Sequence, residues 1–272
     1  MGLSFITIIA MFPTFFKYKQ NPFMSFYHYF SNIIKLDFGG YKLNFYDRFA
    51  KPIFPDLFHF YSKSISYLIF SIIIGIALGI LFSIVILLLK KKWRKPILWL
   101  NYFLISFPDF LLILILQALV IWIYQKTGTS IGNVYSRVDD EAILLPMITL
   151  SLFPFIYTLR NSLNTFEGIF TKDFILFAYA KGLSKREIIF SHMLKNALPI
   201  ILASLPSILQ VSIANLFIVE LVYGIPGIMK LLYNNQTMEV IFPSLLFIWL
   251  TYFVVDVGIR FGKKQLQEGM AK

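Results

Sequence analysis

The sequence predicts an all-α polytopic membrane protein with about six transmembrane helices. Of its 272 residues, 58% are hydrophobic and only 14% are charged, whereas about one quarter of the residues in a soluble domain are charged. Several uncharged apolar runs are long enough to cross the ~30 Å hydrocarbon core of a bilayer as helices. These runs are continuous and do not alternate with polar residues, which excludes a membrane β-barrel.

The first two segments differ in character. Residues 1–16 are apolar and uncharged, and they lack the basic start and small-residue cleavage site of a signal peptide. We therefore expect a first membrane helix that enters from the cytoplasm. Residues 17–63 are too polar to span and rich in aromatic side chains, so we expect them on the outer surface, partly in the membrane interface where Tyr and Trp are favoured.

The second expected span, residues 64–89, is the clearest. It carries Gly75 and Gly79 at GxxxG spacing, which predicts close packing against another helix. The basic run KKKWRK follows it directly, and clustered Lys and Arg beside a span mark the cytoplasmic side. The alternative role for this basic run is contact with anionic lipid headgroups.

The third expected span, residues 97–124, is interrupted by Pro108 and Asp109. A proline kinks a membrane helix and frees a carbonyl group. An ionisable side chain at such a depth faces protein or water and marks a functional site by default. Asp109 therefore lines a transport pathway, caps a broken helix, or lies at a shallower depth in the membrane.

The remaining spans are expected at 142–159, 197–219 and 240–259, and Gln210 and Asn215 add polar pathway candidates to the fifth. The segments at 90–96, 160–197 and 260–272 hold 15 of the 25 Lys and Arg residues. Because basic residues concentrate on the cytoplasmic side, this distribution predicts that both chain ends and all three segments are cytoplasmic.

Several function classes are excluded by what the chain lacks. There is no cysteine, and the three histidines stand apart at positions 28, 59 and 192, so we expect no metal site and no cofactor. No phosphate-binding loop or nucleophile elbow is present, so we expect no catalytic residues. The net charge is +11, but the basic residues lie beside apolar spans, where they orient the helices. We therefore expect no nucleic-acid partner.

Two motifs carry a family resemblance. The stretch AYAKGLS, from Ala178 to Ser184, is followed by His192 and by KNALP. It resembles the cytoplasmic coupling loop of ABC importer permeases, in particular the oligopeptide, dipeptide and nickel branch. The GIPG run from Gly224 to Gly227, preceded by Glu220, is similar to the GxPG stretch that follows the fifth span in these permeases.

The resemblance implies a function and a set of partners. The chain would be one of two permease subunits of an ATP-driven importer of the type I permease fold in the bacterial cell membrane, taking up peptides or nickel-like small solutes. It would work with a second permease, two cytoplasmic ATP-binding subunits and an extracellular or periplasmic solute-binding protein, and ATP would be hydrolysed in those ATP-binding partners. Residues 1–63 would hold the first helix and external segment, and residues 64–272 the permease core with the coupling segment at 161–197.

The resemblance also assigns site residues. The expected ATPase-coupling residues are Phe177, Ala178, Ala180, Lys181, Gly182, Leu183 and Ser184. Phe174, Phe177 and Ala178 would share one helix face, Gly182 would allow a sharp turn, and the small Ala178 and Ala180 would let a partner groove approach. The expected external gate consists of Glu220, Gly224, Pro226 and Gly227, with Glu220 bracing the loop or meeting the partner permease instead of binding substrate.

Alternatives stay open. The basic, amphipathic coupling segment could instead lie on the lipid surface. A secondary transporter driven by an ion gradient would need inverted repeats and ionisable residues at mid-membrane, and only Asp109 is such a candidate. An intramembrane enzyme would need a nucleophile–base pair or metal ligands. The chain also departs from the family in its short first helix and in Lys230, which stands where a small residue or Arg is common.

Overall fold

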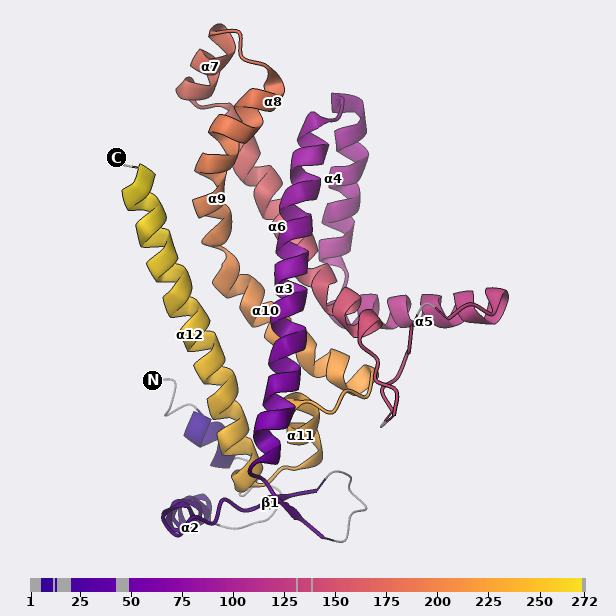
Figure 1. Cartoon of the computed structure of the whole chain (residues 1–272), viewed down its shortest axis with the longest axis vertical. Coiled ribbons are helices and arrows are strands. Elements are labelled where there is room, and N and C mark those ends of the chain that lie inside the picture. Colours follow the sequence, from indigo (N-terminus) through magenta and orange to yellow (C-terminus); the bar gives the residue numbers. More distant parts are fainter. Residues whose placement is uncertain are drawn as a thin grey trace.

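The computed structural model describes residues 6–11, 13, 21–42, 49–130, 132–137 and 139–270, which are almost entirely helical (Figure 1). In chain order the elements are α2 (Pro22–Ile34), β1 (Gly40–Tyr41), β2 (Lys51–Pro52), α3 (Asp56–Leu88), α4 (Lys91–Ser106), α5 (Asp109–Thr127), α6 (Leu144–Phe170), α7 (Asp173–Ala180), α8 (Lys185–Glu187), the π-helix η1 (Ile188–Met193), α9 (Leu194–Leu202), α10 (Leu205–Val222), α11 (Ile228–Asn234) and α12 (Met238–Met270). The only sheet among these residues is the antiparallel β1–β2 pair, in which Gly40 faces Pro52. The all-helical prediction is confirmed.

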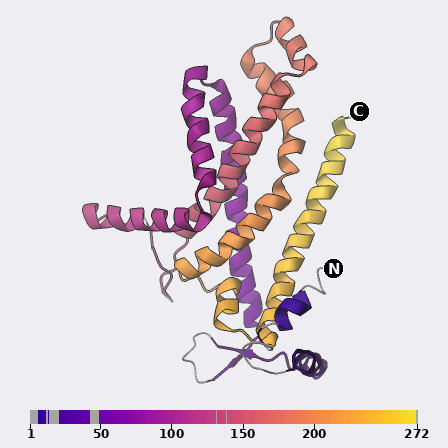
Figure 2. The same ribbon diagram turned by 180° about the vertical axis from the view of Figure 1, so that it is seen from behind.

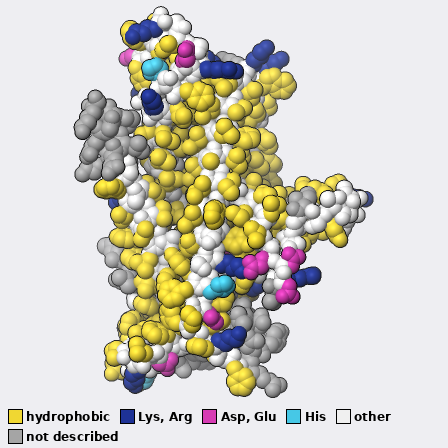
Figure 3. Space-filling view, viewed as in Figure 1, with side chains coloured by type: hydrophobic (Ala, Val, Ile, Leu, Met, Phe, Trp, Pro, Cys, Tyr) yellow, Lys and Arg dark blue, Asp and Glu magenta, His cyan; other side chains and the backbone are white. Residues whose placement is uncertain are grey.

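The described residues contain four helices that are long and apolar enough to cross a membrane, namely α3, α5, α10 and residues 238–262 of α12. α6 is also long and runs beside α3 (Figure 1). Apolar side chains cover the length of the visible face, whereas Lys and Arg gather toward its ends (Figure 3). This distribution is that of a protein whose middle lies in lipid and whose ends lie in water. Most of the expected first span, 1–16, lies outside the described residues.

The α3–α6 pair is the centre of the bundle. A Cβ atom at Gly75 would come within 2.6 Å of the Ser151 carbonyl oxygen, and one at Gly79 within 2.7 Å of the Thr158 Cβ. The two glycines therefore let the helix backbones approach more closely than any side chain would permit, which confirms the packing interpretation of the GxxxG spacing.

The expected third span is the clearest difference from the prediction. Residues 97–124 do not form one interrupted helix. They are divided between α4, which lies along α3, and α5, which runs across the bundle in both views (Figures 1 and 2). Pro108 follows Phe107, whose ψ of 138° is extended. A residue before proline avoids the helical region, so the chain turns here instead of kinking.

The expected fifth span is also two helices. α9 ends at Leu202 and α10 begins at Leu205, with Ala203 and Ser204 between them. Pro206 stands in the first turn of α10, where its missing N–H costs nothing. The helical stretch from Lys185 therefore reaches this break directly from the segment that resembles a coupling loop.

The three basic segments lie at one end of the molecule. The α3–α4 turn, the α7–α8 region and the end of α12 are at the top of Figure 1, whereas α2, β1 and α11 are at the bottom. The fold thus groups the segments that the charge distribution assigns to the cytoplasm. That this end faces the cytoplasm remains a prediction.

Two large hydrophobic clusters divide the interior. One lies in the half that contains α11 and includes Leu57, Leu216 and Tyr223. The other lies in the opposite half and packs α7, η1 and α9 against α3 and α6 through Ile175 and Ile189 among others. The coupling-like segment is therefore part of the folded core and not an appended loop.

Candidate functional site

The segment that resembles a coupling loop folds as two helices with a turn at Gly182. The φ angle of Gly182 is +82°, a left-handed conformation that residues with a Cβ atom rarely adopt. The amide of Gly182 donates to the Tyr179 carbonyl at 2.9 Å, and the amide of Leu183 donates to the Ala178 carbonyl at 3.3 Å. These bonds close the last turn of α7, so the glycine sets where α7 stops and where α8 starts.

Ser184 begins the second helix through a capping box. Its Oγ accepts from the Glu187 amide at 3.3 Å, and the Glu187 carboxylate accepts from the Ser184 amide at 2.7 Å. Hydrogen bonding to Ser184 holds the pKa of the Glu187 carboxyl below its ordinary value. The KGLSKRE sequence thus contains both a helix stop and a helix start.

The two sides of α7 have different environments. Ile175 and Ala178, three residues apart, are buried against the core. Four apolar side chains are instead exposed, and we call them the coupling face: Phe174, Leu176, Phe177 and Tyr179, with 43%, 57%, 61% and 42% of their surface accessible. The Lys181 ammonium lies 4.6 Å from the centre of the Phe177 ring at the edge of this face.

The structure corrects one detail of the prediction. Ala178 does not share a face with Phe174 and Phe177 and cannot admit a partner groove, because it is only 4% exposed within its own chain. Ala180 and Gly182 are exposed as expected. Leu176 and Tyr179 were missed. The signal for them was the i, i+3 spacing of Ile175 and Ala178, which defines the buried stripe and leaves the other side chains outside.

Two cations meet at the C-terminal end of α3, Lys185 from this segment and Arg94 from α4. The Lys185 ammonium and the Arg94 guanidinium both donate to the Leu87 carbonyl, and Arg94 Nε donates to the Leu89 carbonyl at 3.1 Å. Burial, with a smaller contribution from Arg94, lowers the pKa of Lys185. Because cations at a helix C-terminus meet the negative end of its dipole, this contact joins α8 to α3. Sequence reasoning did not find it.

At the opposite end, the Glu220 carboxylate is completely buried. Its Oε1 accepts from Ser64 Oγ at 2.5 Å, and its Oε2 accepts from the amides of Met229 and Lys230 at 2.9 and 3.0 Å. Ser64 Oγ in turn accepts from the Ile228 amide at 2.8 Å. The first amides of α11, which have no partner within the helix, are thus satisfied by α3 and α10.

The GIPG turn fits closely around this network. A Cβ atom at Gly227 would lie 2.3 Å from Glu220 Cδ, so only glycine leaves room for the carboxylate. The Lys230 ammonium donates to the Gly224 carbonyl at 2.9 Å and closes the turn that Pro226 shapes. Glu220, Gly224, Pro226 and Gly227, which the sequence grouped, are therefore adjacent, and the departure at Lys230 is part of the same unit.

The candidate pathway residues are only partly brought together. Asn215 of α10, which is 3% exposed, donates from Nδ2 to Asp109 Oδ2 at 3.0 Å. Asp109 also lies in the first turn of α5, where the helix dipole favours an anion. Gln210 is elsewhere on α10 and donates to the Tyr252 hydroxyl at 2.9 Å. Within the part of the chain that the structure describes, no three His, Cys, Asp or Glu side chains are placed to hold a metal ion.

Residues 71–261 match the protein family described as "Binding-protein-dependent transport system inner membrane component". The glutathione transport system permease protein GsiC of Shigella flexneri serotype 5b (strain 8401) is 25% identical over 252 residues, which cover 88% of this chain and 77% of the relative.

Two further relatives agree. GsiC of Escherichia coli (strain K12) is 26% identical over 252 residues, with the same 88% and 77% coverage. The peptidoglycan transport system permease protein YejB of Agrobacterium fabrum (strain C58 / ATCC 33970) is 27% identical over 203 residues, covering 70% of this chain and 56% of the relative. The matched region, 71–261, includes the coupling face and all of the Glu220 network except Ser64.

Proposed function

Since this chain belongs to the family of binding-protein-dependent transport system inner membrane components, we propose that it is a peptide-importing permease whose coupling face docks on a cytoplasmic ATPase. It is a multi-pass permease subunit of an ABC importer in the bacterial inner membrane. Two relatives are named for glutathione, a peptide, and for peptidoglycan, which contains peptides. That naming supports a peptide or a similarly small solute as the cargo here, with nickel-type solutes as the second possibility.

The observation that carries the docking proposal is the coupling face itself. The helix that carries it, α7, lies at the end of the molecule beyond the α3–α4 turn (Figure 1), and its four apolar side chains are exposed there. A membrane-surface helix would lie level with the basic turn that marks the membrane boundary. A face that extends past that boundary suits a protein partner in water, and aromatic side chains in such a patch supply most of the binding energy of an interface.

The fold offers a route from docking to the pore. The helical stretch α8–η1–α9 runs from Lys185 to the break at Ala203 and Ser204, and α10 continues from there to Glu220. Movement of the ATPases would shift α7 and α8, and the shift would change the angle at this break. Because Glu220 holds the start of α11, that angle would set the position of the GIPG turn. Two packed states related in this way constitute alternating access.

The remaining partners follow from the family and not from the site. A second permease would complete the pore, two ATP-binding subunits would hydrolyse ATP, and an external solute-binding protein would deliver cargo. The alternative of a secondary transporter has no support from the family match. Its candidate charge, Asp109, accepts a hydrogen bond from Asn215 and lies at the N-terminus of α5.

The docking proposal is tested by co-purification. The chain would be tagged and purified together with the ATP-binding subunits of the same transporter, as wild type and as Gly182→Asp. A Cβ atom at Gly182 meets nothing within 4 Å, and Asp is among the residues that best tolerate its left-handed φ of +82°, at a strain of about 1–2 kcal/mol. The added carboxylate would therefore strain the α7–α8 turn by this amount and would act mainly on the partner. We expect normal membrane abundance and a large loss of ATPase. Full retention of ATPase and transport would place the docking surface elsewhere.

A further inference from the structure

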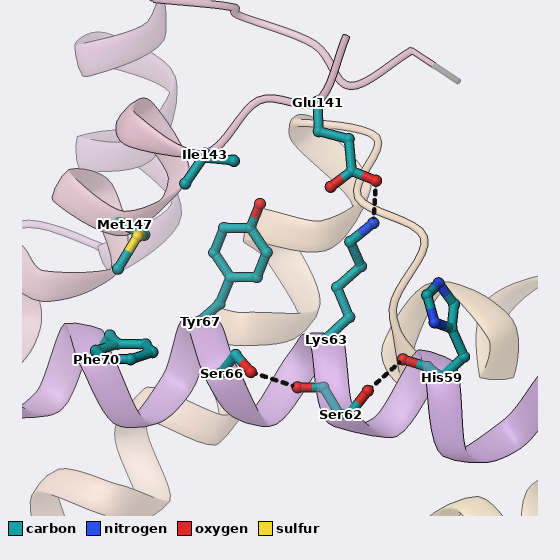
Figure 4. Close-up of a pocket in the computed structure, with 9 residues that line it drawn as sticks. All are labelled: His59, Ser62, Lys63, Ser66, Tyr67, Phe70, Glu141, Ile143 and Met147. Atoms are coloured by element: carbon teal, nitrogen blue, oxygen red, sulfur yellow. Dashed lines mark hydrogen bonds and ion pairs between the residues drawn. The ribbon is translucent and has the colours of Figure 1, made fainter. Parts of the chain in front are cut away.

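A pocket of about 440 Å³ opens beside the first half of α3 (Figure 4). This part of α3 lies in the half of the molecule opposite α7 (Figure 1). Its walls are α3 and the segment that leads into α6. The apolar part is formed by Tyr67, Phe70, Ile143 and Met147, and the charged part by Lys63 and Glu141 (Figure 4). The volume is in the range of pockets that bind small molecules, and a mostly apolar wall with a few convergent polar groups is their usual composition.

The two charges of the pocket face each other. The Lys63 ammonium forms an ion pair with the Glu141 carboxylate, with side chains 14% and 40% exposed. Because Glu141 is open to solvent, its share of the pair contributes little net stability. A ligand that carried both a carboxylate and an ammonium group could therefore separate the pair at small cost and give each charge a new partner. A neutral ligand would gain nothing from this exchange.

The walls of the pocket are bonded to the GIPG turn. The Tyr67 hydroxyl donates to the Ala142 carbonyl at 2.8 Å, and the Ala142 amide donates to Ser136 Oγ at 3.1 Å. The Ser136 amide then donates to the Tyr223 carbonyl at 2.7 Å, directly before Gly224. On the other side Ser64, the residue after Lys63, holds Glu220. A ligand that displaced Glu141 would therefore pull on both supports of the turn.

From these contacts we infer that this pocket is an entry site for a short zwitterionic peptide, with its carboxylate on Lys63 and its amino group on Glu141. The inference rests on the proposed function and adds to it the place in this chain where the cargo first binds. The apolar walls accept small aliphatic side chains, and the ionic ends select a free peptide over a blocked one. Occupancy would be signalled to the GIPG turn through Ala142, Ser136 and Tyr223.

The absence of cysteine allows a direct test. Ser66, on the pocket wall, is replaced by Cys in the transporter assembled with its partners in nanodiscs, and its modification by a membrane-impermeant thiosulfonate reagent is timed. Tri-alanine at saturating concentration should slow the reaction about ten-fold or more, whereas N-acetyl-tri-alanine amide should leave the rate unchanged. Ser130→Cys, on the exposed outer loop, is the matched control and should react equally with and without either peptide.

A second variant tests the charges. In the Ser66→Cys background, Glu141→Gln should raise the tri-alanine concentration for half-protection about ten-fold or more, because the amino group loses its ionic partner. The double exchange Lys63→Glu with Glu141→Lys keeps an ion pair and reports whether folding alone is affected. Equal protection by the blocked peptide would overturn the inference, as would protection that Glu141→Gln leaves unchanged.

Two remaining outcomes are separable. If Ser66→Cys reacts in the isolated chain but not in the assembled transporter, the partner permease fills the pocket and the peptide site is refuted. ATPase co-purification and ATP-dependent uptake, measured on the same sample, report on the proposed function. If the transporter imported tri-alanine but tri-alanine did not slow the modification of Ser66→Cys, the entry site would be refuted and the proposed function would stand.

Discussion

Replacement of Glu220 by Ala and by Gln should have clearly different effects on stability. The carboxylate accepts three hydrogen bonds in a fully buried site, from Ser64, Met229 and Lys230. Ala would leave three buried donors without an acceptor, at about 1–3 kcal/mol each when nothing replaces the bond. Since such costs do not add fully, we expect Glu220→Ala to lower the free energy of unfolding by about 3–5 kcal/mol.

Gln has the same shape and keeps one oxygen. That oxygen can still accept from the Met229 and Lys230 amides, and the Ser64 hydroxyl can rotate to accept from the new amide group. The remaining loss is the charge-assisted part of the bonds, so Glu220→Gln should cost about 1–2 kcal/mol. Transport should fall in this variant, while ATPase association and membrane abundance remain unchanged.

The assay is SDS denaturation of the purified chain in mixed micelles, with Ser106→Ala as the control for an exposed hydroxyl outside the network. If Glu220→Ala and Glu220→Gln were equally stable within about 0.5 kcal/mol, the carboxylate would not be holding α11. If Glu220→Gln changed only the apparent affinity for substrate, Glu220 would be a substrate ligand, contrary to its complete burial.

Three further predictions concern the coupling segment and the topology. Phe177→Asp should reduce co-purifying ATPase at least about ten-fold. The control Tyr233→Asp, which replaces an aromatic side chain that is 49% exposed at the opposite end, should not reduce it; equal losses would argue against a docking face. Ser184→Ala should speed amide exchange in the first turn of α8. In wild type the protection factor of these amides, which is the intrinsic exchange rate divided by the observed rate at the same pH, should also fall as the pH drops through the pKa of Glu187. A lowered carboxyl pKa adds stability above the ordinary value of about 4, and this stability is lost as the pH falls through the lowered value; a protection factor independent of pH would refute the prediction. Single cysteines placed at Lys92, Gly182 and Glu268 should resist an impermeant thiol reagent in intact cells. Rapid labelling of these cysteines from outside would contradict the predicted topology.

The sequence was sufficient where one local rule decides the structure. The uncharged run after Lys63 forms most of α3, and the GxxxG glycines pack on α6 because no other residue leaves room. Gly182 ends one helix and precedes the next, as its left-handed φ requires. The grouping of Glu220 with the GIPG turn also followed from sequence, because both belong to one continuous motif.

The sequence was insufficient where tertiary packing decides. Pro108 indicated an interruption but not its angle, so the division into α4 and the crosswise α5 was not predicted. The side of α7 that is buried depends on the neighbouring α6 and η1, which placed Ala178 inside. The contact of Lys185 with the Leu87 carbonyl joins residues 98 positions apart. No periodicity in the chain signals such a contact.

The central claim is that this permease imports peptide when ATPases act through the coupling face. The most direct measurement is uptake of radiolabelled tri-alanine by proteoliposomes that contain the chain with its second permease and ATP-binding subunits. ATP is enclosed inside, and the solute-binding protein is added outside. We predict uptake that requires both ATP and the binding protein and that is lost in Phe177→Asp. Uptake driven by an imposed ion gradient without ATP, or uptake undiminished in Phe177→Asp, would contradict the account.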